Sequence, residues 1–147
     1  MQPAAARSRP EPGPAPIAVP PTGTHCLLEL YGCPFDRLND LPQLRADLRA
    51  AAEQSGATWL GDLAQAFTPQ GVTVLVLLAE SHLSIHTWPE AGYAAIDVFT
   101  CGDRALPDRA CHWLIDRLGA RDYRLMHMPR GQLDRPDRRP PEPGDHG

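Results

Sequence analysis

Apolar and polar residues alternate in short runs through the middle of the chain, which is typical of β-strands that bury one face. Glycine, proline and other turn-forming residues separate these runs. The pattern predicts six strands, at residues 25–31, 57–67, 71–78, 81–87, 93–100 and 121–128. The run GVTVLVLL at 71–78 is rich in β-branched residues, which predicts a buried strand.

Two segments carry apolar residues at helical spacing instead. The first follows Asp40, a helix-capping residue type, ends near Gly56 and has its apolar stripe at Leu41, Leu44, Leu48 and Ala52. The second opens at Pro107, ends near Gly119 and has one face formed by Ala110, Trp113, Leu114, Arg117 and Leu118. The order β-α-β-β-β-β-α-β predicts an α+β fold, a two-layer sandwich of a mostly antiparallel sheet with two helices on one face.

The composition separates one folded domain from two tails. Of the 17 prolines, seven lie in residues 1–23 and five in residues 129–147. Segments so rich in proline and polar residues cannot bury enough apolar surface to fold, so both tails are expected to be disordered. The folded part is expected at residues 24–128, which is long enough for a single domain with a modest core.

The basic residues exclude several classes of function. The chain has a formal net charge of −4, and all 14 of its basic residues are arginine. Without lysine, the protein cannot bind pyridoxal phosphate as an internal aldimine or form a Schiff base through a lysine. An acidic chain with scattered arginines is also a poor candidate for non-specific nucleic-acid binding.

Membrane and secreted locations are not expected. The longest apolar run, residues 72–79, is far shorter than the roughly 20 residues of a membrane-spanning helix, and no signal peptide is evident because prolines follow the N-terminal arginines. The four cysteines, Cys26, Cys33, Cys101 and Cys111, form no CxxC pair, which predicts neither a disulfide framework nor a zinc site. A reduced, cytoplasmic location is expected.

Chemically active side chains are concentrated in residues 79–102. They are Glu80, Ser81, His82, Ser84, His86, Glu90, Asp97 and Cys101. On a strand, positions 82, 84 and 86 share one face, so the spacing favours a solvated polar row and leaves a zinc site at His82 and His86 as an alternative. By residue type, Cys101 is expected as a small buried residue, and Phe67 and Trp88 as core residues. Residue types and spacing therefore predict a polar cluster in a sheet without defining a reaction.

A resemblance to a known family indicates which reaction to expect. Residues 79–102 read AESHLSIHTWPEAGYAAIDVFTCG and closely resemble the signature of the short bacterial and archaeal S-adenosylmethionine decarboxylase proenzymes. The flanking segments HCLLELYGC, SGAT and PQGVT resemble that family too, in the same order. The resemblance covers residues 24–130, nearly the whole expected domain.

Members of this family cut their own chain, and the resemblance places the cut between Glu80 and Ser81. It implies that the Ser81 hydroxyl attacks the Glu80 carbonyl, that the resulting ester is eliminated, and that Ser81 becomes a pyruvoyl group. The products would be a β chain of residues 1–80 and an α chain of residues 81–147. His86 matches the family's proton acceptor for processing, and Thr73 stands where many members have a processing serine.

The same resemblance assigns the steps of turnover. S-adenosylmethionine forms a Schiff base with the pyruvoyl group, loses CO2 and yields decarboxylated S-adenosylmethionine, the aminopropyl donor for spermidine. Cys101 matches the catalytic proton donor, Phe67 an aromatic ring that stacks on the adenine, and Glu90 a carboxylate that holds the ribose. The implied cofactor is the pyruvoyl group, with no pyridoxal phosphate and no metal, and the implied assembly is a dimer of αβ units.

Some positions depart from the family pattern. Val74 follows Thr73 where glycine is common, and Gln65 stands where the family's HxF segment has histidine. Because this histidine lies near the substrate end, a pyruvoyl-dependent decarboxylase of ornithine or arginine is the main alternative. A binding module that keeps the fold without processing is a second alternative, although the residues assigned to processing and catalysis are all present.

Overall fold

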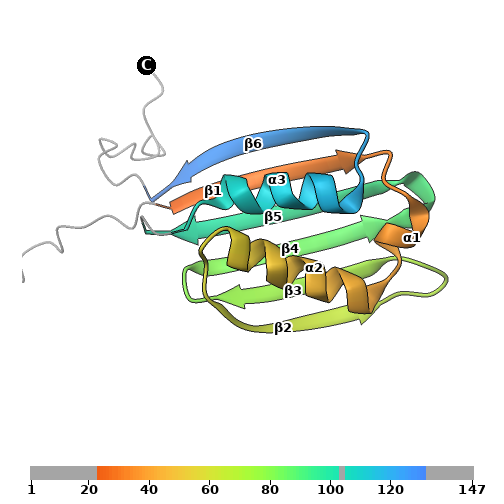
Figure 1. Ribbon diagram of the computed structural model, residues 1–147, viewed down its shortest axis with the longest axis horizontal. Helices are drawn as coiled ribbons and strands as arrows, with labels where there is room; N and C mark the ends of the chain where they lie inside the picture. Colours follow the sequence, from red (N-terminus) through yellow and green to blue (C-terminus); the bar gives the residue numbers. More distant parts are fainter. Residues whose placement is uncertain (1–22, 103–104, 132–147) are drawn as a thin grey trace, which may run out of the picture.

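The computed structural model describes residues 23–102 and 105–131, which form a six-stranded antiparallel sheet covered by helices (Figure 1). The strands lie in the order β2-β3-β4-β5-β1-β6. Their bounds are β1 (Gly23–Tyr31), β2 (Trp59–Ala66), β3 (Val72–Leu78), β4 (Ser81–Trp88), β5 (Tyr93–Cys101) and β6 (Asp122–Arg130). Because β1 pairs with both β5 and β6, the first and last strands lie side by side.

Two helices, α2 (Leu41–Gln54) and α3 (Pro107–Leu118), pack next to each other across one face of the sheet (Figure 1). The Asp40 side chain caps α2 by accepting a hydrogen bond from the backbone N–H of Gln43 at 3.0 Å, as its sequence position predicts. α3 ends before Gly119, whose φ of 66° is the left-handed conformation that commonly terminates helices. The predicted α+β sandwich is confirmed.

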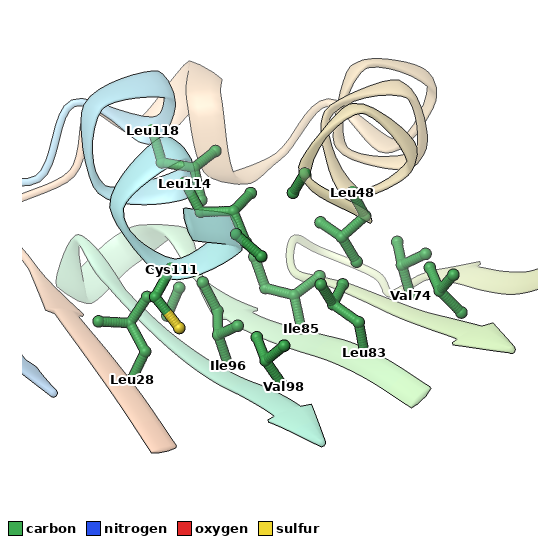
Figure 2. Close-up of a cluster of buried hydrophobic side chains, with 14 of the residues drawn as sticks. Leu28, Leu48, Val74, Leu83, Ile85, Ile96, Val98, Cys111, Leu114 and Leu118 are labelled. Carbon is green, nitrogen blue, oxygen red and sulfur yellow. The ribbon is translucent and has the colours of Figure 1, made fainter. Parts of the chain in front are cut away.

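The hydrophobic core fills the space between the sheet and the two helices (Figure 2). Side chains alternate along each strand, so Val74 and Val76 of β3 are buried in the core while Leu75 points to the other face. The helices contribute leucines that face the sheet, among them Leu48 of α2 and Leu114 of α3. Burial of these side chains holds the helices against the strands that carry the candidate site.

The buried face of α3 differs from the predicted one. Cys111 and Ile115 are buried, whereas Trp113 is half-buried and Arg117 is exposed. Arg117 lies outside the core because its guanidinium reaches a carboxylate on the neighbouring helix, with 2.9 Å between its Nε and Oδ1 of Asp47. Arg117, which has the spacing of the apolar face, therefore contacts the neighbouring helix and not the sheet.

The ends of the folded part differ slightly from the expected ones. Gly23 and Arg130 pair in register, so β1 and β6 both extend beyond the expected limits at 24 and 128. The pattern also does not predict the short helices α1 (Phe35–Leu38) and η1 (Pro89–Ala91), because segments this short show no helical spacing. The tail residues 1–22 and 132–147 lie outside the described residues. In the described part of the chain, no helix is long and apolar enough to cross a membrane.

The face of the sheet opposite the helices, hereafter the open face, is covered by no helix among the described residues (Figure 1). Large apolar side chains on it are strongly exposed: Leu63 is 75% exposed, Leu77 59% and Met128 51%. Leu63 and Leu77 lie on the neighbouring strands β2 and β3, and exposed apolar side chains grouped in this way are typical of an interface with another protein chain.

Candidate active site

The peptide bond between Glu80 and Ser81 lies in a strained segment. Glu80 is in the turn that joins β3 to β4, and Ser81 is the first residue of β4. The backbone φ of Ser81 is 148°, the only positive φ of a non-glycine residue in the described part of the chain. Such a conformation costs a residue with a side chain roughly 1–3 kcal/mol. The strain is thus located at the bond where the family resemblance predicts cleavage.

Cys101 lies beside this bond because β4 and β5 pair with Ser81 opposite Thr100. The backbone N–H of Cys101 donates a hydrogen bond to the Glu80 carbonyl oxygen at 2.9 Å, and the thiol donates to the same oxygen at 2.8 Å. Two donors on one carbonyl oxygen stabilise negative charge there, as in an oxyanion hole. Cys101 is exposed, so the expectation of a buried residue was wrong.

The Glu80 carboxylate is held by Thr58. The Thr58 backbone N–H donates to one carboxylate oxygen at 2.9 Å, and the Thr58 hydroxyl donates to the other at 3.1 Å. Desolvation raises the pKa of Glu80, but the hydrogen bonds from the Thr58 backbone, from Glu80's own N–H and from the Thr58 hydroxyl outweigh it, so this pKa lies below its ordinary value. Thr58 therefore anchors the residue that precedes the cleavage site. The sequence signal for this role is the SGAT segment, which resembles the family but has no function that residue type or spacing predicts.

An imidazole is also within reach of the Ser81 hydroxyl. The Ser81 Oγ and the Nδ1 of His82 are 3.1 Å apart. A neutral imidazole nitrogen can accept the proton of a hydroxyl. From residue types and spacing, His82 is expected in a polar strand end and a solvated polar row, with metal binding as an alternative, and its position next to Ser81 is the sequence signal for this contact.

Four further candidate residues gather near the other end of β4. Thr73 on β3 is opposite His86 on β4, and the Thr73 Oγ1 is 2.8 Å from the His86 Nδ1. Both residues line a cavity of about 380 Å³, together with Phe67, Trp88 and Glu90. This volume lies within the range of small-molecule sites. Phe67 and Trp88 are 54% and 43% exposed, so the expectation that they belong to the core was wrong.

Within one chain, these two groups of residues are well separated. The first, hereafter the cleavage cluster, consists of Thr58, Glu80, Ser81 and Cys101. The second, hereafter the cavity cluster, consists of Phe67, Thr73, His86 and Glu90. Ser81 and His86 are five positions apart along β4, which corresponds to about 16 Å on an extended strand. The structure therefore brings together the members of each cluster, but it does not bring the two clusters together.

The polar row on β4 is not simply solvated, and it cannot bind one metal ion. Ser84 is only 7% exposed and lies 3.5 Å from Asp97, which also contacts His25 at 2.8 Å. His82 and His86 are four residues apart on the same strand, which places them about 13 Å from each other. The alternative of a zinc site at these two histidines is therefore excluded.

An α+β domain with a strained peptide bond, a hydroxyl on one side of that bond and two donors on its carbonyl oxygen is typical of a proenzyme that rearranges its own backbone. Comparison with known proteins names the family. The family model described as S-adenosylmethionine decarboxylase matches residues 24–131. The chain therefore belongs to the S-adenosylmethionine decarboxylase family.

Individual relatives agree with this assignment. The chain is 56% identical to the S-adenosylmethionine decarboxylase proenzyme of Prochlorococcus marinus over 108 residues, which is 74% of this chain and 86% of the relative. It is 44% identical to the proenzyme of Syntrophomonas wolfei over 117 residues, 80% and 93% of the two chains. The crystal structure of adenosylmethionine decarboxylase from Aquifex aeolicus matches with a TM-score of 0.73 and 35% identity, and covers 82% of this chain and 100% of that one.

Proposed function

We propose that this chain is a self-processing, pyruvoyl-dependent decarboxylase that converts S-adenosylmethionine to CO2 and decarboxylated S-adenosylmethionine. The latter is the aminopropyl donor for spermidine. The observation that carries the proposal is the Glu80 carbonyl, which accepts two hydrogen bonds from Cys101 beside the Ser81 hydroxyl. Family membership supports the substrate, and the four unpaired cysteines support a reducing, cytoplasmic location.

Processing starts with attack by the Ser81 Oγ on the Glu80 carbonyl carbon. The carbonyl oxygen gains negative charge, which the Cys101 N–H and S–H stabilise. The C–N bond then breaks, so that Glu80 becomes an ester of the Ser81 oxygen and the Ser81 nitrogen becomes a free amine. Loss of the Ser81 α-proton expels the Glu80 carboxylate and leaves a C=C bond, and water then replaces the nitrogen, which leaves as ammonia. The products are chains 1–80 and 81–147, the second with an N-terminal pyruvoyl group.

The residues present fit this cofactor, because its carbon atoms come from Ser81 itself and no lysine is needed. Once formed, the pyruvoyl ketone supplies the electron sink for loss of CO2 from an amino acid bound to it. Cys101 then holds a proton at its Sγ beside the former cleavage site, where it can return that proton to the substrate's α-carbon. Phe67 offers an aromatic face to the adenine and the sulfonium, and Glu90 offers a carboxylate to the ribose hydroxyls.

We further propose that the two clusters act in one site formed by two copies of the chain. Because Ser81 and His86 of one chain are about 16 Å apart, His86 cannot remove a proton from its own Ser81. Thr73 and His86 face the same side of the sheet as the exposed Leu75 and Leu77, which is the open face. If two open faces pack about a two-fold axis perpendicular to β4, the start of one β4 lies over the end of the other. His86 of the partner then approaches Ser81, and each dimer contains two such sites.

Intact-mass spectrometry combined with CO2 release tests this function. The purified full chain should give two masses, and the 81–147 chain should carry a ketone that reacts with a hydrazide. Carboxyl-labelled S-adenosylmethionine should release labelled CO2, while ornithine and arginine should not. Ser81→Ala should stay uncut and inactive.

A persistent 147-residue chain without decarboxylation would contradict the enzyme assignment. Cleavage together with release of CO2 from ornithine or arginine instead would contradict only the substrate.

A further inference from the structure

A second group of reactive side chains lies on the helix-covered face of the sheet, beside the edge strand β6. The side-chain ligand atoms of Cys26 on β1, Asp108 on α3 and His127 on β6 all lie within 4.8 Å of one another. Cys26 and His127 are directly opposite each other in the β1–β6 pair, so their side chains are neighbours. This group is separated by the sheet from the open face.

A fourth side chain, Cys111, lies next to this group. Asp108 and Cys111 are three residues apart on α3, so both lie on the same side of the helix. Figure 2 shows the Cys111 sulfur pointing from α3 toward the sheet. The Cys111 thiol is close enough to the Cys26 thiol to raise its own pKa and lower that of Cys26. Asp108 from the helix and Cys26 and His127 from the paired strands thus converge, and Cys111 lies beside them on the same helix.

The four side chains differ in burial in a way that suits an ion. Cys26 and Cys111 are both 0% exposed, while the His127 and Asp108 side chains are 46% and 51% exposed. The sulfurs are therefore on the inner side, and the imidazole and carboxylate form a rim through which an ion can enter. At the rim, the His127 Nε2 and the Asp108 Oδ1 are 2.5 Å apart.

We propose that Cys26, Cys111, Asp108 and His127 form a binding site for a zinc-class divalent cation. Thiolate, imidazole and carboxylate are the ligands of tetrahedral zinc, and four of them complete such a site. Hard cations such as Mg²⁺ and Ca²⁺ prefer oxygen ligands and would be poor occupants. Since the site joins β1, β6 and α3, the ion stabilises the fold without a role in decarboxylation.

The site could not be predicted from the sequence because its ligands come from three separate elements. The absence of a CxxC pair led to the expectation of no metal, and the DxxC spacing at Asp108 and Cys111 is too common to indicate one. Only the register of β1 with β6, and the position of α3 above them, bring Cys26, Asp108 and His127 together, with Cys111 beside them.

Cobalt titration of the metal-free, reduced full chain tests the proposal. Co²⁺ should bind one per chain, with the thiolate-to-cobalt charge-transfer absorption and the visible bands of tetrahedral cobalt, and Zn²⁺ should displace it. Asp108→Asn and His127→Gln should weaken Co²⁺ affinity by about tenfold or more. Cys111→Ser should remove much of the charge-transfer absorption, with circular dichroism to confirm folding.

Two matched controls identify the site. His112→Gln changes another histidine on the same face of the molecule, and Cys33→Ser changes another buried thiol; neither should alter the titration. The proposal is overturned if no charge-transfer absorption appears. It is also overturned if the absorption survives both His127→Gln and Asp108→Asn unchanged, or disappears only with Cys101→Ser.

Discussion

At the scale of single residues, the proposed cleavage site combines contributions from the backbone and from side chains. Ser81 provides a hydroxyl in a strained backbone, Thr58 holds the Glu80 carboxylate, and Cys101 donates twice to the Glu80 carbonyl. Because one of the two Cys101 donors is a backbone N–H, a change of its side chain removes only part of the stabilisation. Loss of the Cys101 side chain should therefore affect processing and turnover to different degrees.

Cys101→Ala should still be cut, but slowly. The variant keeps the backbone N–H on the Glu80 carbonyl and loses the S–H donor, so we expect cleavage to slow by roughly tenfold or more. Decarboxylation by the processed variant should fall further, by roughly 100-fold or more, because the proton donor is gone. Timed mass spectrometry measures the cut and labelled CO2 measures turnover. Unchanged turnover would contradict the assignment of Cys101 as donor.

Thr58→Val should slow processing while the fold stays intact. The variant loses the hydroxyl that holds the Glu80 carboxylate, and loss of a hydrogen bond to a charged group costs about 1.5 kcal/mol, or about tenfold in rate. Thr100→Val is the matched control. Thr100 is opposite Ser81, but its buried hydroxyl has no hydrogen-bond partner, so its loss should not slow the cut. Equal cleavage rates in the two variants would show that the Thr58 contact is unimportant.

Cys33 should be unreactive in the folded protein. Burial raises the pKa of its thiol to about 11, and the thiolate is the form that alkylating agents attack. The experiment is run near pH 8.5, because an ordinary thiol has a pKa of about 8.5. At this pH, iodoacetamide should modify the exposed Cys101 and spare Cys33 until denaturant is added. Because the folded pKa is raised, this burial contributes stability below the unfolded pKa, and the contribution is lost as pH rises toward 11. Peptide mapping that finds both cysteines modified at one rate would contradict this.

At the scale of elements, α2 and α3 are linked by a buried carboxylate. The Asp47 side chain is 4% exposed and accepts hydrogen bonds from Gln43 and Arg117. We expect Arg117→Met to lower the free energy of unfolding by about 1.5–3 kcal/mol, because a charged acceptor loses its cationic partner. Arg109→Met, on the same helix, removes an arginine that has no ion pair among the described residues and should change stability little. Urea unfolding measures both, and equal losses would show that the ion pair has no specific role.

The strands and long helices could be predicted from sequence because each carries its own local signal. Alternation marked the strands, and Asp40 and Gly119 marked helix ends. The inward side of α3 could not be predicted, because the position of Cys111 depends on contacts with β1, and that of Arg117 on a carboxylate in another helix. Local periodicity gives the type of an element, whereas its orientation follows from contacts distant in sequence.

At the scale of the whole molecule, the family resemblance gave candidate residues for the site but not their arrangement. Ser81 and His86 are close in sequence, yet β4 holds them about 16 Å apart because the chain between them is extended. Thr58 and His82, which contact Glu80 and Ser81, were assigned no role in processing from sequence. The exposed apolar residues of the open face then suggest how the separated clusters meet, in a dimer whose copies complete each other's sites.

Complementation between two inactive variants tests this central claim most directly. Ser81→Ala lacks the hydroxyl and His86→Asn lacks the processing base, so each homodimer should be uncut and inactive. In a mixed dimer, the His86→Asn chain keeps Ser81 and meets an intact His86 from its partner, which restores one site of the two. The mixed dimer can be purified after co-expression of the two variants with different affinity tags. Mass spectrometry should then find the His86→Asn chain cut and the Ser81→Ala chain whole. Decarboxylation should be restored to about half of the wild-type value per dimer. A mixed dimer in which neither chain is cut, prepared beside a fully processed wild type, would contradict a site shared between two copies.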